Sequence, residues 1–140
     1  MKTIQFFLYL FALITLSYCV SQKEVVRCVK NQLGKPYVYG AAGPDSFDCS
    51  GLAYYCHNKA IPRTASAQSS GSGRSIAKSN LQAGDLMFWN TGGNGVSHTT
   101  VYIGGGRMIH APKTGDVVKE VASSSSYWDP KFVNAKRYWS

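Results

Sequence analysis

The apolar positions of the chain follow a helical period in the first half and a strand-like pattern in the second. Val25, Val26, Val29 and Leu33 recur at the spacing of one helical face, which predicts a helix over residues 21–33. A short extended piece and an irregular Gly/Pro loop follow this helix. Two more helices are then predicted, over residues 49–58 and 64–70.

The second half carries short apolar runs separated by turn residues, which is the pattern of antiparallel strands. The predicted strands span residues 85–90, 98–103, 107–110, 117–121 and 132–138. Helices followed by an antiparallel sheet predict an α+β fold in which the N-terminal helices pack on a central sheet. The length of 140 residues fits a single domain.

A Gly-Gly-Gly turn before Arg107 decides where two histidines lie. If it is a three-residue hairpin loop, Ile103 pairs with Arg107 and Thr100 pairs with His110. His98 then shares a face with His110, and the two imidazoles are diagonal neighbours. A two-residue turn would place them on opposite faces. Two histidines on one face are also typical of surface or metal-binding pairs. A catalytic role is therefore indicated only if the chain also carries a candidate nucleophile.

Charge limits the partners that the chain can have. Lysine and arginine number 15 against 7 acidic residues, a formal net charge of +8. A basic surface suits nucleic acid, anionic lipid or an acidic wall polymer. Because no Lys/Arg run or nucleic-acid motif is present, nucleic acid is not expected. The alternative is that the charge serves solubility alone.

The N-terminus has the pattern of a secretory signal peptide. Lys2 gives a basic start, residues 4–16 are almost all apolar, and small residues follow. Removal of residues 1–20 would leave a secreted domain over residues 21–140 without stable membrane association. A retained anchor and lipidation at Cys19 are the alternatives.

Three cysteines then remain, which is an odd number for a secreted chain. Cys28 and Cys56 fall in two predicted helices, so their pairing would leave Cys49 as a free thiol. Three unpaired thiols are the alternative. No CxxC or Cys/His spacing indicates a zinc site, and no metal or cofactor is expected.

Cys49 is the candidate nucleophile. It stands where the loop over residues 41–47 gives way to a predicted helix capped by Asp48. Unpaired N–H groups and the positive end of the macrodipole at a helix start favour the thiolate form. His98 and His110 downstream are candidates for its base. The alternative is a buried structural cysteine.

Six segments together resemble the NlpC-type family of papain-like cysteine peptidases, which cut peptidoglycan stem peptides. They are GKPYVYG (34–40), FDCSGL (47–52), PRTA (62–65), LQAGDLMFW (81–89), SHTTVYIG (97–104) and MIHAP (108–112). The resemblance covers nearly the whole predicted mature chain, in the family's order. It implies a papain-like fold with Cys49 as nucleophile, His98 as base and His110 as the residue that orients His98.

The resemblance also assigns residues around the nucleophile. Tyr37 matches the tyrosine that helps to form the oxyanion hole, the alternative being an ordinary packed aromatic. Asp48 and Ser50 would bind the free amine of a trimmed stem peptide, unless Asp48 is only a helix cap. Arg63 belongs to the same implied substrate site. Thr99-Thr100 departs from the family, which more often has an apolar residue and then glycine.

The implied function is that of a secreted, monomeric cysteine endopeptidase. It would hydrolyse the bond between γ-D-glutamate and the diamino acid of peptidoglycan stem peptides, with no cofactor. Two alternatives stay open. The first is a non-catalytic peptidoglycan-binding module on the same fold. The second is a papain-like amidase or acyltransferase that acts on a different bond.

Overall fold

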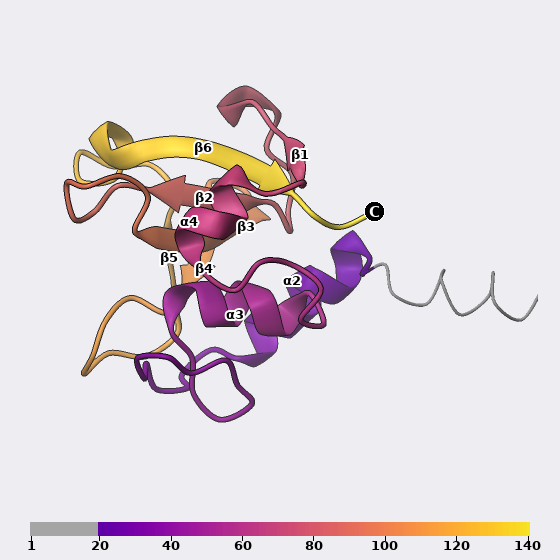
Figure 1. Ribbon diagram of the computed structural model, residues 1–140, viewed down its shortest axis with the longest axis vertical. Coiled ribbons are helices and arrows are strands. Elements are labelled where there is room, and N and C mark those ends of the chain that lie inside the picture. Colours follow the sequence, from indigo (N-terminus) through magenta and orange to yellow (C-terminus); the bar gives the residue numbers. More distant parts are fainter. Residues whose placement is uncertain (1–19) are drawn as a thin grey trace, which may run out of the picture.

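Figure 1 shows the computed structural model, which describes residues 20–140. Its helical first half comprises α2 (Gln22–Asn31), α3 (Cys49–Cys56) and α4 (Ala65–Ser70). The strands are β1 (Arg74–Ser75), β2 (Leu86–Trp89), β3 (His98–Gly104), β4 (Arg107–His110), β5 (Lys119–Ala122) and β6 (Phe132–Arg137). The predicted signal peptide, except for Val20, lies outside the described residues. Within those residues, no helix has the length and apolar character that a membrane crossing requires.

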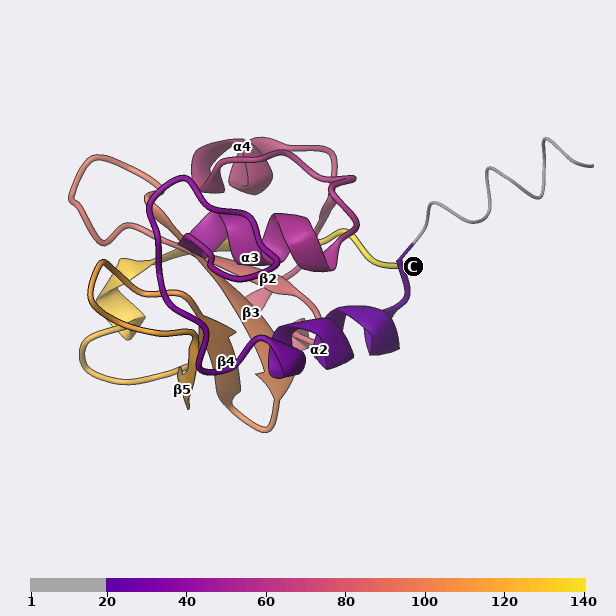
Figure 2. The same ribbon diagram turned by 90° about the horizontal axis from the view of Figure 1, so that it is seen from below.

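The strands form one sheet in the order β1-β6-β2-β3-β4-β5, and every neighbouring pair is antiparallel. Helices α3 and α4 pack against β3, and α2 packs on α3. All three lie on the same side of the sheet (Figure 2). The predicted α+β fold is therefore confirmed.

Apolar side chains fill the space between the helices and the sheet. This core includes Val25, Val29, Leu52, Phe88, Val101 and Ile109. Burying a side chain of this size contributes about 1.5–3 kcal/mol. A smaller cluster of Met87, Trp89 and Met108 covers the opposite face of the sheet under Trp128.

Helix α2 begins as its sequence predicts and ends earlier. Ser21 and Glu24 form a reciprocal capping box, with both hydrogen bonds at 3.2 Å. Val25 is fully buried, but Leu33 is 45% exposed because the helix ends at Asn31. The prediction that placed Leu33 on the buried helical face is therefore wrong.

The β3–β4 hairpin reaches the expected register by a different route. Gly104 pairs with Arg107, so the loop has two residues, and a bulge follows Tyr102. The bulge adds one residue to β3, and this residue makes up for the one missing from the shorter loop. The residues of β3 before the bulge therefore keep the partners on β4 that a three-residue loop would give them. Val101 opposes Ile109, and the next step of that ladder sets Thr100 opposite His110. The shared face is confirmed, but the three-residue loop is not.

A disulfide joins Cys28 of α2 to Cys56 of α3. The open question of cysteine pairing is thereby settled in favour of the Cys28–Cys56 bridge. Among residues 20–140, Cys49 is the free cysteine. The nucleophile candidate therefore stands on a helix that the disulfide ties to its neighbour.

Candidate active site

The loop over residues 41–47 leads into helix α3, and its first residue packs against the first turn of that helix. The Asp48 side chain accepts a hydrogen bond from the Gly51 N–H at 2.6 Å and is the N-cap, as predicted. The carbonyl oxygen of Ala41 lies where a Cβ on Gly51 would be. Only glycine therefore fits this turn, which holds Cys49 half-buried at the start of the helix.

The two histidines meet directly. His98 Nε2 lies 2.9 Å from His110 Nδ1, and the two residues are 6% and 5% exposed. If His98 Nε2 donates to His110 Nδ1, then His98 Nδ1 keeps its lone pair and can accept a proton. His110 in its neutral form can therefore orient His98 and accept a hydrogen bond from it.

The charge state of Cys49 differs from the expectation. Burial raises the pKa of its thiol, and the Asp48 carboxylate raises it further, against hydrogen bonds from the backbone of Thr99, Ser50 and Cys49. Burial and the charge of His110 lower the pKa of His98 to about 3. The resting pair is thus a neutral thiol and a neutral imidazole, because burial outweighs the helix terminus.

The start of β3 places the backbone of Thr99 next to the Cys49 thiol. Thr99 follows His98 in the chain, and its backbone lowers the pKa of the thiol against the effect of burial. Within residues 20–140, no direct hydrogen bond joins the Cys49 sulfur to His98. Catalytic hydrogen bonds are often long before substrate binds and tighten in the complex.

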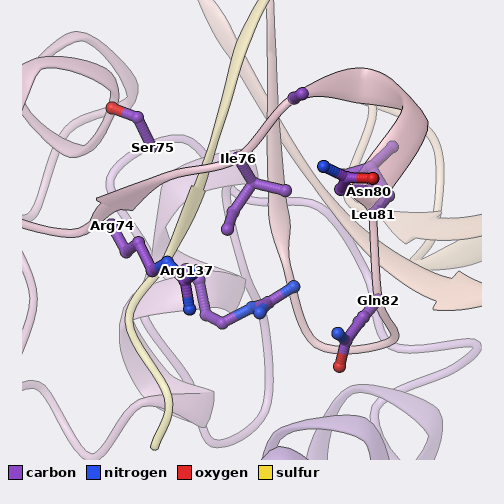
Figure 3. Close-up of a pocket in the computed structure, with 8 residues that line it drawn as sticks. Arg74, Ser75, Ile76, Asn80, Leu81, Gln82 and Arg137 are labelled. Atoms are coloured by element: carbon purple, nitrogen blue, oxygen red, sulfur yellow. The ribbon is translucent and has the colours of Figure 1, made fainter.

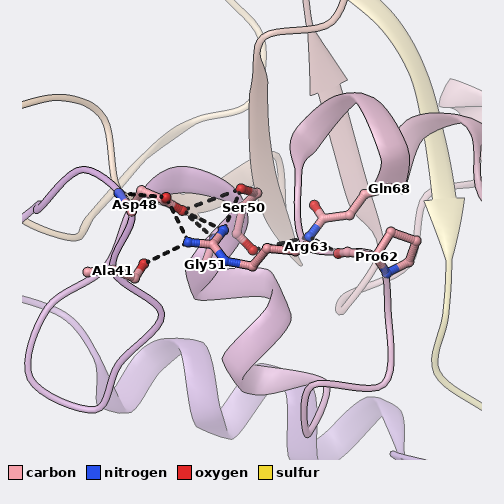
Figure 4. Close-up of polar contacts among 8 residues, drawn as sticks. Ala41, Asp48, Ser50, Gly51, Pro62, Arg63 and Gln68 are labelled. Carbon is pink, nitrogen blue, oxygen red and sulfur yellow. Dashed lines mark hydrogen bonds and ion pairs between the residues drawn. The ribbon is translucent and has the colours of Figure 1, made fainter.

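Figure 4 shows the polar cluster beside the nucleophile. The Arg63 guanidinium donates to both Asp48 carboxylate oxygens, at 3.0 and 2.8 Å, and to Ser50 Oγ at 2.9 Å. The Asp48 carboxylate also accepts from Gly40, Ser50 and Gly51. Asp48, Ser50 and Arg63 are thus brought together, and Asp48 is both a helix cap and an ion-pair partner.

Tyr37 is half-buried and lies near both Cys49 and Asp48. Burial raises the pKa of its phenol, and the charges of Cys49 and Asp48 raise it further. The phenol is therefore neutral at physiological pH and keeps a proton to donate. Within the described part of the chain, the Tyr37 hydroxyl has no hydrogen-bond partner, so it is free to face a substrate.

Gln68 of α4 is a supporting residue that the sequence did not reveal. It is fully buried and donates to the carbonyl oxygens of Ser50 and Pro62, at 3.1 and 2.8 Å (Figure 4). Its own carbonyl oxygen accepts from Thr99 Oγ1 at 3.0 Å. Gln68 therefore links the neighbour of the nucleophile to the neighbour of His98, and explains the polar residue at position 99.

Trp128 is the second such residue. Its indole stacks on His98 with ring centroids 5.8 Å apart and an interplanar angle of 18°, and meets His110 edge-on. The ring of Trp89 packs against that of Trp128, with centroids 4.7 Å apart. Trp89 Nε1 donates a hydrogen bond to Thr100 Oγ1 at 2.9 Å. No periodicity or motif signals Trp128, because it lies in a loop far along the chain from both histidines.

Another polar cavity lies at the β1 edge of the sheet, away from these residues. It has a volume of about 390 Å³ and its lining includes Arg74 and Arg137 (Figure 3). None of the predicted site residues lines it. Within residues 20–140, no group of three His, Cys, Asp or Glu side chains is arranged to hold a metal ion.

The lowered pKa values of the histidines make stability depend on pH. Burial lowers the pKa of His57, and it lowers those of His98 and His110 to about 3 and about 4. In the unfolded chain each histidine titrates near 6.5. As pH falls from 7.5 to 5, the unfolded chain therefore gains protons that the folded protein does not.

We expect the free energy of unfolding to fall over this range by about 1–2 kcal/mol per histidine. Urea unfolding at several pH values measures it. A His57→Gln variant should show a smaller pH dependence than the wild type. A free energy that is constant between pH 7.5 and 5 would contradict the burial of the neutral histidines.

A thiol at a helix start beside a histidine pair on an antiparallel sheet defines a papain-like domain. The NlpC/P60 family model matches residues 34–137, and the chain belongs to that family. A solved NlpC/P60 structure from Bacillus cereus is 32% identical, with a TM-score of 0.79, over 87% of this chain and 41% of that one.

Two curated relatives carry names that describe an activity. The murein DD-endopeptidase MepH of Escherichia coli is 38% identical over 82% of this chain and 45% of its own length. The gamma-D-glutamyl-L-lysine dipeptidyl-peptidase of Bacillus subtilis is 32% identical over 77% and 38%. This chain therefore spans less than half the length of either relative.

Proposed function

We propose that this chain is a secreted cysteine endopeptidase that hydrolyses peptidoglycan stem peptides. The observation that carries the proposal is the His98–His110 hydrogen bond beside the free thiol of Cys49, in an NlpC/P60 domain. The intact nucleophile and histidine pair favour an enzyme over a non-catalytic binding module. The Cys28–Cys56 disulfide suits an oxidising, extracellular destination, and residues 1–20 would be the signal peptide that leads there.

The acylation step uses the neutral resting pair. His98 Nδ1 takes the thiol proton as the Cys49 sulfur attacks the scissile carbonyl carbon. The Cys49 N–H and the Tyr37 hydroxyl would donate to the oxyanion that forms. The His98 imidazolium, held by its hydrogen bond to His110, then protonates the leaving amine nitrogen, and a thioester remains on Cys49.

Deacylation returns the enzyme to its starting state. His98 takes a proton from water, the hydroxide oxygen attacks the thioester carbonyl, and the Cys49 sulfur leaves and recovers the proton from His98. The sum of both steps adds one water across one amide bond. Every proton moves between the substrate, water and the Cys49–His98 pair, so the chain's own residues suffice for the cycle.

The bond that we propose is the one between γ-D-glutamate and the diamino acid. The name of the Bacillus subtilis relative specifies a γ-D-glutamyl bond to lysine, which supports this choice. The name of the Escherichia coli relative favours a second candidate, the D,D bond that cross-links two stem peptides. Purified muropeptides incubated with the protein should gain new amino groups. Alkylation of Cys49 should prevent this gain, and a gain that survives alkylation would contradict a cysteine mechanism.

The Asp48 carboxylate and the Ser50 hydroxyl would accept hydrogen bonds from the free N-terminal amine of the acyl half, and Arg63 would hold both acceptors in place. We expect peptides with a free amine to be cleaved about tenfold faster than their N-acetyl forms, the scale of a charged hydrogen bond. The two kcat/KM values measure this preference. Asp48→Asn changes the net charge of the Asp48–Arg63 pair from 0 to +1, so it should abolish the preference.

Arg63→Gln is the opposite charge change at the same ion pair. It leaves the Asp48 carboxylate without its guanidinium partner, so the preference for the free amine should persist or increase. Asp48→Asn also removes an ion pair in which Asp48 is 13% exposed, and we expect some loss of stability with it. Equal preference in the wild type and both variants would show that Asp48 only caps α3.

A further inference from the structure

A cavity of about 300 Å³ lies against the histidine pair, on the far side of β3 from the helices. Both imidazoles line it, together with Trp128, with Lys113 and Asp116 of the loop between β4 and β5, and with Lys119 at the start of β5. Ligand sites have volumes from about 300 Å³ upward. The amine-recognition cluster lies at the start of α3, and none of its three residues lines this cavity.

The reaction places the leaving half of the substrate on the His98 side. His98 must deliver its proton to the leaving amine nitrogen, so this nitrogen and the residue that carries it come next to the imidazole. The acyl half, in contrast, extends from the Cys49 sulfur toward Asp48. A cavity that His98 itself lines is therefore in the position to receive the leaving half.

The charges at the cavity favour an anion. Lys119 Nζ is paired with Asp116 at 2.7 Å. The Lys113 ammonium has no hydrogen-bond or ion-pair partner within residues 20–140. Two lysines against one aspartate leave the rim with a charge of +1, supplied by an exposed side chain that is free to move toward a ligand.

The wall of the cavity suits an aliphatic stem. Trp128 is fixed by stacking on His98 and by its contact with Trp89, and Pro112 contributes another apolar surface. A residue with a methylene chain could lie along these rings while a carboxylate reaches the ammonium at the rim. Such an arrangement pairs an apolar contact with one charged contact that fixes orientation.

We propose that this cavity is the subsite for the leaving half of the substrate, and that Lys113 there binds a carboxylate of the residue that leaves. The proposal rests on the proposed function, because it takes the leaving half from that reaction. The carboxylate can be on the side chain of the leaving residue or at the C-terminus of the leaving peptide. Both sources offer Lys113 the same charged acceptor.

Three stem peptides separate the sources: one with both carboxylates free, one with the side-chain carboxylate amidated, and one with the C-terminal carboxylate amidated. In the wild type, amidation of the recognised carboxylate should lower kcat/KM about fivefold, the scale of an exposed ion pair. Lys113→Gln should lower kcat/KM for the free peptide to that of the amide and leave the amide unchanged. Lys30→Gln, the same charge change on helix α2 at a residue that does not line the cavity, should alter none of the values.

Binding to the Cys49→Ala variant tests the subsite without turnover. The amine-terminated leaving fragment should bind about fivefold more weakly when Lys113→Gln is added, and its amide should bind equally to both proteins. If the wild type cleaves none of the peptides, the proposed function fails, and this comparison still decides the subsite. The proposal would be overturned if Lys113→Gln weakened the binding of the carboxylate fragment and of its amide equally, or if it weakened the binding of neither.

Discussion

The Cys49→Ala variant is expected to lose at least about 10⁴-fold in hydrolysis while it keeps its fold, because removal of a nucleophile leaves only binding and polarisation. The thiol is half-buried at the first turn of α3, and the cap formed by Asp48 and Gly51 does not involve it. Rates of muropeptide cleavage measure the loss, and circular dichroism verifies the fold.

The remaining described cysteines provide the matched control. A double Cys28→Ala, Cys56→Ala variant loses the disulfide and should be about 2–4 kcal/mol less stable. It should still hydrolyse muropeptides at temperatures below its melting point, because Cys49 is unchanged. Cleavage by Cys49→Ala, or loss of cleavage in the folded double variant alone, would contradict the assignment of Cys49.

Substitution of the two paired histidines should have unequal effects. His98→Ala should be as damaging as Cys49→Ala, because a thiol whose pKa burial has raised needs a base to lose its proton. His110→Ala should cost less, about 10–100-fold, because His110 orients His98 and transfers no proton itself. Single-turnover rates at pH 7.5 measure both effects.

Two further variants make this comparison specific. His110→Gln retains an oxygen that can accept from His98 Nε2, so it should recover part of the activity that His110→Ala loses. His57→Gln replaces the third histidine, which hydrogen-bonds to Ala53 within α3, and should leave the rate unchanged. Equal and small losses for His98→Ala and His110→Ala would mean that the pair does not take part in catalysis.

Local signals predicted the elements that depend on local chemistry. The apolar spacing of Val25 and Val29 indicates α2, the capping residue Asp48 marks the start of α3, and short apolar runs mark β2, β3 and β4. Strand β1 was not predicted, because two exposed residues carry no pattern and pair only through the edge of β6. The bulge after Tyr102 was also missed, since its position depends on how the hairpin packs.

The site divides in the same way. The segments that resemble the family point to Cys49 and its two histidines, and the register of the predicted hairpin already places these histidines side by side. Gln68 and Trp128 act through contacts across the fold, which no linear spacing records. The direction of the thiol pKa was misjudged because the helix terminus is visible in the sequence, whereas burial is not.

Mass spectrometry of the products from purified muropeptides tests the central claim most directly. With the wild type, we predict two new fragments that together contain one added water. One should end in D-glutamate, and the other should begin with the free amine of the diamino acid. Cys49→Ala should yield neither fragment. Separation of cross-linked stem peptides at the D,D bond, or the same fragments from Cys49→Ala, would contradict the account.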